Sequence, residues 1–409
     1  MKVCAKVSCV YTPSKEILEK YAKVLVNFAL WGGKGIKKGD VVYLQASECA
    51  KPLFVAIRNQ IIKSGGNVIS SYLPDDTAKE YYELASDEQL DFAPNKYYKG
   101  LVEEIDHSIA ILSETNKREL ESIQPKKIMR KAKTIKQYRE WRTDKENRGK
   151  LTWTLAMWGT KAMADEVGLS EKEYWDQIIK ACFLDEKDPV AKWKAAMAEI
   201  DRLRKKLNSL QIEKVFVQGD GVDLTVGLGK GRQWLGGTGR NIPSFEVFIS
   251  PDWRQTEGTA EFNQPLYRYG NIIEGIKLTF KNGLIVKASA KKNEKVLKEM
   301  IASDEGSNKI GEFSLTDSRL SRITKFMGET LFDENIGGKY GNTHIAIGSS
   351  YKDSYPGDPS KVAKATWKKL GYNDSVVHTD IITTTKRTVT ALLPGGSKKV
   401  IYQDGQFTI

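Results

Sequence analysis

Two of the three histidines in this sequence, His344 and His378, lie close to acids in the C-terminal half. Glu334 precedes the first histidine, and Asp380 follows the second by two residues. The valines and isoleucines of Ser375–Ile381 predict a strand, in which residues two apart point to the same face. His378 and Asp380 would then lie side by side and could bind one cation. Imidazole and carboxylate ligands together suit zinc, cobalt or manganese better than calcium.

A metal-dependent hydrolase needs further ligands, and the C-terminal half offers two more acids. Glu246 lies in NIPSFEVFISPD and Glu312 lies in KIGEFSL. Both have apolar or turn-like neighbours, where an unpaired carboxylate would be costly to bury. From the residues alone, a surface glutamate at the end of a strand is the favoured interpretation of each.

Several motifs follow one another in the C-terminal half, and together they carry a resemblance. They are GDGVDLTVGL, NIPSFEVFISPDWRQTEGT, IIEGIKLTFKNGLIV, IGEFSL, LFDEN and HIAIGSSY. In this order they resemble the thermophilic metalloaminopeptidase family. The resemblance is fainter in the N-terminal half, where LSETN and DEKDPVAKW also match.

The resemblance implies an enzyme that hydrolyses the N-terminal residue from peptides with two divalent metal ions, for which zinc, cobalt and magnesium are candidates. It also implies a homodimer with the site in an internal cavity. Carried over motif by motif, the implied metal ligands are Glu246, Glu312, Glu334, His344, His378 and Asp380. Glu246 is also a candidate to move protons, and Glu312 is the expected bridge between the ions. Tyr351, at the end of HIAIGSSY, matches an active-site tyrosine and could stabilise an oxyanion.

Three features depart from the family pattern. Phe245 stands where the family commonly carries a second acid, which predicts the loss of a neighbouring contact. The loop between Asn335 and His344 is longer, which could alter substrate access. The tail beyond Asp380 matches poorly and could affect specificity. None of these differences removes a predicted ligand.

The elements of the first half alternate between strand and helix patterns. Strand, helix and strand at this spacing form a βαβ unit and predict a parallel sheet. A helix is expected to start at Thr12-Pro13, with proline at its first position. The expected strands are residues 40–44, 67–73, 108–112 and 151–158, and further helices are expected at 53–62, after the capping box of Ser170 and Glu173, and at 190–210.

The sequence pattern changes near Gly219. From there glycine is frequent, and apolar and polar residues alternate as they do in strands. Asn282-Gly283 between two such strands indicates a hairpin, and a helix is expected at Glu294–Ile301. The predicted fold is therefore α/β, with an N-terminal parallel-sheet domain (1–215) and a mixed, mostly antiparallel C-terminal domain (216–409) that carries the metal site.

Composition narrows the class of protein. The 409 residues are 40% hydrophobic and 28% charged, which is typical of soluble globular proteins. No apolar run approaches the roughly 20 residues that span a membrane, and no signal peptide is evident, so neither a membrane partner nor export is expected and the cytoplasm is the expected location. The cysteines (Cys4, Cys9, Cys49 and Cys182) form no C-x-x-C pair, which favours free thiols.

The net charge of +12 raises the possibility of a polyanionic partner. Much of it lies between Lys117 and Lys150, in a pattern typical of a solvated helix face. Glycine-aromatic RNA motifs and a helix-turn-helix signature are missing, so no nucleic-acid partner is expected. His107 is interpreted as structural or solvent-facing. Two alternatives to the aminopeptidase stay open: a dinuclear amidohydrolase acting on a non-peptide amide, and a non-enzymatic basic RNA-associated protein.

Overall fold

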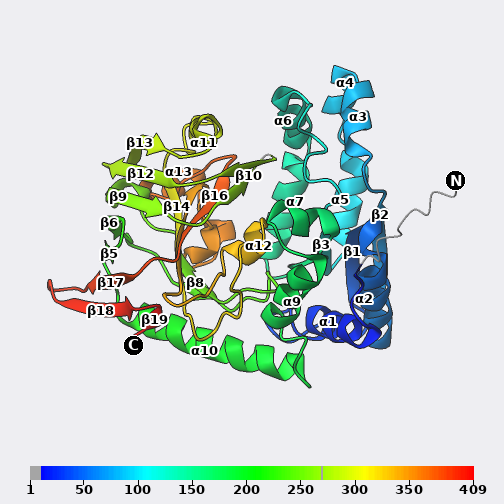
Figure 1. The fold of residues 1–409 in the computed structure, drawn as a ribbon, viewed down its shortest axis with the longest axis horizontal. Helices are drawn as coiled ribbons and strands as arrows, with labels where there is room; N and C mark the ends of the chain where they lie inside the picture. Colours follow the sequence, from blue (N-terminus) through cyan, green and yellow to red (C-terminus); the bar gives the residue numbers. More distant parts are fainter. Residues whose placement is uncertain (1–10, 269) are drawn as a thin grey trace, which may run out of the picture.

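The computed structural model describes residues 11–268 and 270–409, and its first half is built on a parallel sheet (Figure 1). The strand order is β2-β1-β3-β4, and every neighbouring pair is parallel. These strands are β1 (Val41–Ser47), β2 (Asn67–Leu73), β3 (His107–Leu112) and β4 (Thr152–Met157). The prediction of a parallel sheet is confirmed, and β2 has the predicted bounds.

The helices that were predicted in the first half differ from the observed ones mainly at their ends. Helix α1 begins at Lys15, after Pro13, because the Ser14 hydroxyl accepts a hydrogen bond from the Ile17 N–H and caps the helix. The capping box of Ser170 and Glu173 is present. The helices are α1 (Lys15–Asn27), α2 (Lys51–Lys63), α3 (Ala78–Leu84), α4 (Asp87–Asp91), α5 (Asn95–Glu104), α6 (Pro125–Thr134), α7 (Lys136–Asn147), α8 (Lys161–Glu166), α9 (Glu171–Ala181) and α10 (Pro189–Ser209).

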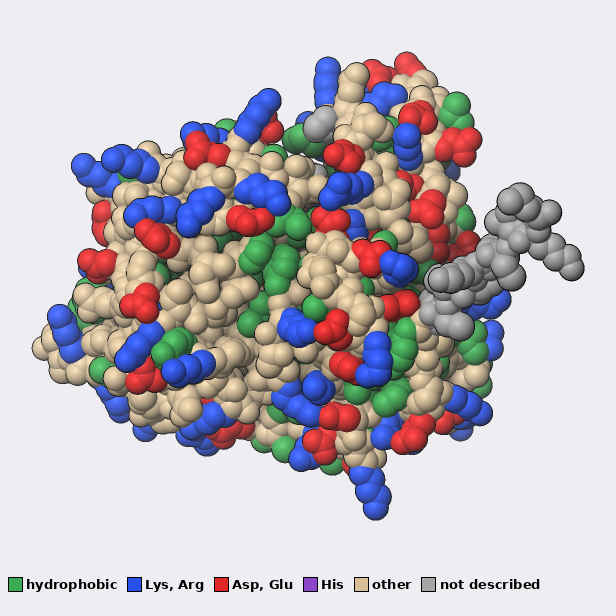
Figure 2. Space-filling model, viewed as in Figure 1, with side chains coloured by type: hydrophobic (Ala, Val, Ile, Leu, Met, Phe, Trp, Pro, Cys, Tyr) green, Lys and Arg blue, Asp and Glu red, His purple; other side chains and the backbone are tan. Residues whose placement is uncertain are grey.

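Helices α3, α4 and α6 project together beyond the parallel sheet, and we call them the helical arm (Figure 1). The Arg130 side chain on α6 pairs with Asp91 on α4, and the Lys127 ammonium donates to the Tyr82 carbonyl on α3. The basic segment forms two helices, α6 and α7, where the charge pattern suggested one helix face. Figure 2 shows acidic side chains interspersed with the basic ones on this face of the arm.

The second half contains antiparallel sheets, as predicted. The larger sheet has the order β13-β12-β9-β6-β5-β17-β18-β19, and β10 and β11 form a separate pair. Asn282 and Gly283 both have positive φ in the β12–β13 turn, which confirms the hairpin. The strands are β5 (Lys214–Gly219), β6 (Val222–Gly227), β9 (Thr256–Phe262), β10 (Leu266–Arg268), β11 (Asn271–Ile273), β12 (Ile276–Lys281), β13 (Leu284–Ser289), β17 (Arg387–Leu392), β18 (Lys398–Gln403) and β19 (Gln406–Phe407).

A second antiparallel sheet, with the order β16-β15-β14-β8-β7, lies between the larger sheet and the first half of the chain (Figure 1). Its strands are β7 (Leu235–Gly236), β8 (Glu246–Ile249), β14 (Ile310–Thr316), β15 (Asn342–Gly348) and β16 (His378–Thr383). The helices of this half are α11 (Glu294–Ile301), α12 (Thr330–Asp333) and α13 (Lys364–Leu370), and α11 has the predicted bounds.

Helix α10 runs along both halves and joins their apolar cores (Figure 1). Trp193, near its start, packs in the first core, whereas Ile200 and Leu203 pack in the second. The first core also takes Phe245 and Phe332 from the second half of the chain. The two halves therefore share packed side chains, and a boundary at residue 215 stays a prediction.

The described residues also bear on three smaller predictions, which concern His107, the cysteines and membrane-spanning helices. His107 is buried, with Nδ1 at 2.7 Å from the Thr152 hydroxyl and Nε2 at 2.9 Å from Asp40, so its role is structural. Cys49 and Cys182 are free thiols, while Cys4 and Cys9 lie outside the described residues. Among the helices described, none combines the length and apolarity that crossing a membrane requires.

Candidate metal centre

The register of the five-stranded sheet places five of the six predicted ligands on one of its faces. Glu312 on β14 pairs with Ala346 on β15, which in turn pairs with Asp380 on β16. His344 is two residues from Ala346, and His378 is two residues from Asp380. Since cross-strand partners and residues two apart share a face, these four side chains point to the same side of the sheet.

Glu246 joins this face because it pairs with Thr316, which lies on the Glu312 side of β14. Small residues, Ala346 and Gly348, stand between the polar side chains and leave room above the sheet. The opposite face carries apolar side chains that are buried in the second core: Val247, Ile249, Phe313, Leu315, Ile345, Ile347 and Ile381. The alternation of the strands thus separates a polar site from an apolar core.

Strand β16 begins at His378, three residues later than the predicted start. The preceding segment is held by Asp304 instead of a neighbouring strand, because the Ser375 hydroxyl and the Val376 N–H both donate to its carboxylate. His378 and Asp380 still lie side by side, with the His378 Nε2 at 3.7 Å from the Asp380 Oδ1.

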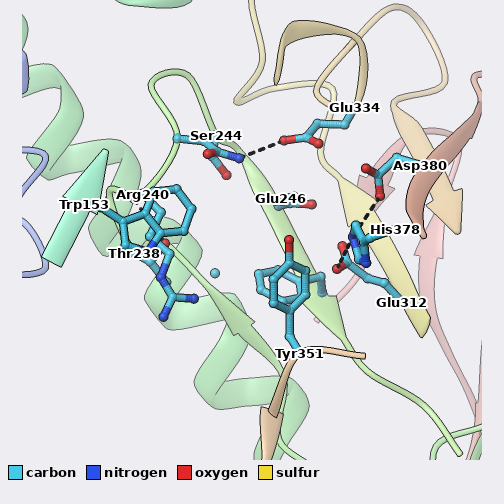
Figure 3. A pocket seen from close by; sticks show the side chains of 14 residues that line it. Trp153, Thr238, Arg240, Ser244, Glu246, Glu312, Glu334, Tyr351, His378 and Asp380 are labelled. Atoms are coloured by element: carbon cyan, nitrogen blue, oxygen red, sulfur yellow. Dashed lines mark hydrogen bonds and ion pairs between the residues drawn. The ribbon is translucent and has the colours of Figure 1, made fainter. Parts of the chain in front are cut away.

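Glu334 reaches the centre from a different element, the C-terminal end of helix α12. The Asn241 Nδ2 donates to the Glu334 Oε1 at 3.0 Å, and the Asn335 Nδ2 lies 3.4 Å from the same oxygen. Figure 3 shows Glu334 near Asp380, with Glu246, Glu312 and His378 completing that end of the pocket.

The polar atoms of the centre lie close to one another. The His344 Nε2 is 3.3 Å from both the Glu246 Oε2 and the Glu312 Oε1, and 3.8 Å from the Asp380 Oδ1. The His378 Nε2 is 3.8 Å from the Glu312 Oε2. Glu246, Glu312 and His344 offer ligand atoms within 4.8 Å of one another, and all three residues are buried.

Both imidazole rings are oriented by their second nitrogen. The His378 Nδ1 lies 2.8 Å from the Ser349 carbonyl oxygen, which can only accept, so Nδ1 carries the proton. The His344 Nδ1 faces the Asn342 Oδ1 at 3.4 Å. This arrangement leaves each Nε2 directed at the carboxylates, which is the orientation that metal-binding histidines generally have.

Burial makes two carboxylates of this centre, Glu312 and Glu334, hard to ionise. Burial raises the pKa of Glu312 to about 7; the hydrogen bond with His344 opposes this shift, and the charges of Glu246 and Asp380 add to it. Burial, with the charges of Glu246 and Asp380, also raises the pKa of Glu334 well above its ordinary value. The pKa of His344 is raised because hydrogen bonds to Glu246 and Glu312 outweigh the effect of burial. Cationic charge would relieve this repulsion.

The centre forms one end of a small pocket of about 50 Å³. Trp153 on β4, Arg240 and Phe248 line the remainder, together with Tyr351. The Tyr351 ring lies 4.8 Å from the His378 ring. Although 40% of Tyr351 is exposed, burial and the charges of Glu312 and Asp380 raise the pKa of its hydroxyl well above the ordinary value.

Several pocket residues lie outside the set predicted from the sequence. Asn241 and Ser244 belong to NIPSFEVF, so their proximity to Glu246 was a usable signal. Nothing in the sequence singles out Trp153 or Arg240, because the first comes from the other half of the chain and the second lies in an irregular segment.

Phe245 points away from the centre. Phe245 directly precedes Glu246, and the two side chains point to opposite sides. The Phe245 ring is fully buried and stacks on Trp193, with ring centroids 5.1 Å apart. Its backbone N–H donates to the Asn335 Oδ1 at 2.7 Å. At this position the chain thus places an apolar side chain in the first core. The divergent tail lies elsewhere too, since it forms strands β17 to β19 of the larger sheet.

Comparison with known proteins agrees with this arrangement. The family model described as thermophilic metalloprotease (M29) matches residues 14–407, nearly the whole chain. The chain belongs to the M29 family. The resemblance predicted from the motifs is confirmed, and membership in M29 makes a bound metal ion an expected component of the protein.

Curated relatives of this M29 protein cover almost its full length. Aminopeptidase T of Thermus thermophilus is 29% identical over 97% of this chain and 99% of its own. Aminopeptidase PepS of Streptococcus thermophilus is 30% identical over 97% and 98%, and aminopeptidase AmpS of Bacillus subtilis is 30% identical over 95% and 98%.

Solved structures show the same fold. Wild-type AmpT from Thermus thermophilus superposes with a TM-score of 0.84 at 26% identity, over 97% of this chain and all of that one. A 2,5-dihydroxypyridine dioxygenase from Pseudomonas putida KT2440 gives a TM-score of 0.54 at 12% identity over 97% and 98%, which is a likeness of fold alone.

The residues of the M29 centre fit a metal ion. Four carboxylates and two imidazoles with inward-facing Nε2 atoms form a donor set that divalent transition metals and zinc bind well. This centre buries more acidic groups than cationic groups. Without a bound ion, that burial would cost folding free energy.

Proposed function

We propose that this M29 metalloaminopeptidase holds two divalent metal ions in the pocket and removes the N-terminal residue from peptides with a free amino group. The observation that carries this proposal is the position of Glu312. Its Oε1 faces His344 and its Oε2 faces His378, so one carboxylate lies between two imidazoles. A shared carboxylate is what two neighbouring ions require.

Charge balance supports two ions over one. Glu246, Glu312, Glu334 and Asp380 would carry four negative charges when ionised, and two divalent ions would neutralise them. We assign these four acids, with His344 and His378, as the ligands. The donor set suits zinc or cobalt, and its many oxygens also leave magnesium possible.

The protein's own groups would handle protons and orient the substrate. When bound, the ions supply Lewis acidity that polarises the scissile carbonyl and lowers the pKa of a water molecule. The Ser314 hydroxyl donates to the Glu246 Oε2 at 2.9 Å and fixes that carboxylate, so Glu246 can accept a proton from the water and pass it to the leaving amine. Tyr351 would donate a hydrogen bond to the oxyanion.

The charge of the pocket favours an exopeptidase. Its lining includes Glu246, Glu312, Glu334 and Asp380, and acids in this number suit the free α-ammonium group of a peptide. Together with M29 membership, this favours the aminopeptidase over the RNA-associated alternative; the non-peptide amidohydrolase is separated from it by substrate tests.

The direct test begins with removal of metal by a chelator, followed by zinc, cobalt or magnesium. We expect metal-dependent release from aminoacyl-p-nitroanilides, refusal of the N-acetylated counterparts, and two ions per chain by elemental analysis. Full activity with one ion per chain would contradict the dinuclear centre. Hydrolysis of the blocked substrates would favour the amidohydrolase.

We also propose that the enzyme is a homodimer that uses the helical arm. The arm exposes Tyr81 and Leu84 on α3, Phe92 at the end of α4 and Met129 on α6, and the exposed fractions of Leu84 and Phe92 are 76% and 65%. Clustered apolar exposure of this kind is typical of interaction surfaces. Light scattering of the purified protein tests this, and replacing Leu84 and Phe92 with serine should yield monomers.

A further inference from the structure

Arg240 lies between two acids that come from different halves of the chain. Its Nη2 is 2.7 Å from the Glu146 Oε1 on helix α7, and its Nη1 is 2.5 Å from the Asp353 Oδ2. The Trp153 Nε1 donates to the same Glu146 oxygen at 3.0 Å. All three charged side chains are about one-quarter exposed (26%, 24% and 29%), so these ion pairs are partly shielded from solvent.

The backbone at Arg240 is fixed to the parallel sheet of the first half. The Leu155 N–H on β4 donates to the Arg240 carbonyl at 2.7 Å, and the Ile242 N–H donates to the Leu155 carbonyl at 3.0 Å. Arg240 therefore starts from a rigid strand edge and extends towards Asp353, which lies two residues after Tyr351.

Among the described residues, the other hydrogen bonds of residues 351–354 come from the second half. The Tyr351 N–H donates to the Ser250 hydroxyl at 2.8 Å, and the Ser354 hydroxyl donates to the Gln233 carbonyl at 2.8 Å. Within the described residues the Tyr351 hydroxyl has no hydrogen bond, and the ring touches Phe248 and His378 by its edges. Through Arg240, which also pairs with Glu146, the Asp353 carboxylate thus connects this segment to the first half.

We propose that Arg240 is a positioning residue: its ion pair with Asp353 fixes the position of the Tyr351 side chain in the pocket. The inference rests on the proposed role of Tyr351 in catalysis. A hydrogen-bond donor for an oxyanion must be held closely, and a displacement of about 1 Å can lower the rate about a hundredfold.

A direct contact of Arg240 with the substrate is disfavoured by its charge environment. Both terminal nitrogens are engaged by carboxylates, and two acids face one guanidinium. The cluster therefore has no positive charge left for a substrate carboxylate. Burial lowers the pKa of Arg240, but the charges of Asp353 and Glu146 outweigh this and raise it, which agrees with a permanently engaged cation.

The test is a double-mutant cycle with Arg240→Met and Tyr351→Phe. In the otherwise unchanged enzyme, Arg240→Met should lower kcat about 10- to 100-fold, with KM changed less than about threefold and metal content unchanged. When Tyr351→Phe is already present, adding Arg240→Met should lower kcat further by a factor of less than about three. If the two substitutions lowered kcat independently, so that their effects multiplied in the double variant, the proposal would be overturned. An effect of Arg240→Met on KM alone would overturn it as well.

Other variants separate positioning from general damage. Asp353→Asn should reproduce the loss of kcat and decides the matter if Arg240→Met does not fold. Glu146→Gln should lower kcat less, because it leaves the Asp353 pair in place, and Arg240→Lys should recover part of the rate. The matched control is Arg322→Met, which breaks a similar pair with Asp185 outside the pocket and should leave kcat unchanged.

A measurement without turnover distinguishes this inference from the proposed function. With 3-fluorotyrosine placed at position 351, the ¹⁹F resonance should shift or broaden in Arg240→Met and Asp353→Asn but not in Arg322→Met. An unchanged resonance in the first two variants would overturn the positioning role. If Tyr351→Phe leaves kcat unchanged, the catalytic role of Tyr351 fails, while the ¹⁹F spectra still decide whether Arg240 holds the ring.

Discussion

The chain contains two buried clusters of histidine and acid, and they differ in their balance of charge. In the first half, His107 lies between Asp40 and Thr152, and Asp40 also accepts from the Lys37 N–H at 2.7 Å. In the second half, His344 and His378 face four carboxylates. The first cluster is complete as it stands, whereas the second has an excess of acid that calls for cations.

The pKa shifts of the two clusters differ in the same way. Burial lowers the pKa of His107 below its ordinary 6.5 despite the hydrogen bond to Asp40, so this ring is kept neutral. At His344, hydrogen bonds to Glu246 and Glu312 outweigh burial and raise the pKa. A histidine near an acid is therefore no indicator of a metal site by itself. The indicator is the number of carboxylates that share the imidazole.

The largest expected effect comes from breaking the second cluster at its centre. Glu312→Gln keeps the volume but removes the charge between the two imidazoles, so metal affinity should fall and kcat should drop by at least about 1000-fold, or about 4 kcal/mol. Elemental analysis and kinetics after dialysis against a fixed metal concentration measure both. A variant with two ions and a normal rate would remove Glu312 from the centre.

Removing only the hydroxyl of Tyr351 separates chemistry from metal binding within the same cluster. Tyr351→Phe should lower kcat about 100-fold, since one oxyanion donor is lost, while metal content stays at two ions per chain. Steady-state kinetics beside elemental analysis provide the check. Loss of metal in this variant would instead make Tyr351 a ligand.

The contrast between the clusters also shows what the sequence could reveal. Strand β2 and helix α11 have the predicted bounds because hydrophobic periodicity and glycine punctuation mark them clearly. Helices α3 to α5 were not predicted, since they are short, polar and mostly exposed, so local pattern gives little signal. The motifs around Glu246, Glu312 and His344 identified the family.

Geometry across the chain was beyond prediction. The alignment of Glu312 with Ala346 and Asp380 follows from the register of three paired strands, β14, β15 and β16. Trp153 lies in the first half and reaches the pocket only because the two halves pack together. Such contacts arise from tertiary packing, and no local pattern records them.

The first cluster should affect stability and leave catalysis intact. His107→Ala removes a fully buried ring and two hydrogen bonds, which should destabilise the protein by about 2–4 kcal/mol. Urea unfolding measures the loss. The kcat and metal content of the folded fraction should match the unchanged enzyme. A lower kcat with normal stability would mean that the clusters are coupled, which would weaken the contrast drawn between them.

The smallest expected effect is a pH dependence of stability that belongs to the first cluster. Because burial lowers the folded-state pKa of His107 below 6.5, the unfolded chain binds a proton there at a higher pH than the folded chain does. Stability should therefore fall as the pH drops below about 6.5, since the unfolded state is favoured by protonation.

Asp40 contributes in a lower range. Burial opposes ionisation of Asp40, but hydrogen bonds from His107, the Lys37 N–H and Trp31 outweigh it and lower its pKa below 3.8. Its contribution is thus lost only in stronger acid. Urea midpoints of metal-free protein at pH 7.5 and 5.5, compared with those of His107→Asn, isolate the histidine, because the metal ligands titrate alike in both proteins. The unchanged protein should lose more stability than the variant between these two pH values. Equal losses would show that His107 exchanges no proton on unfolding.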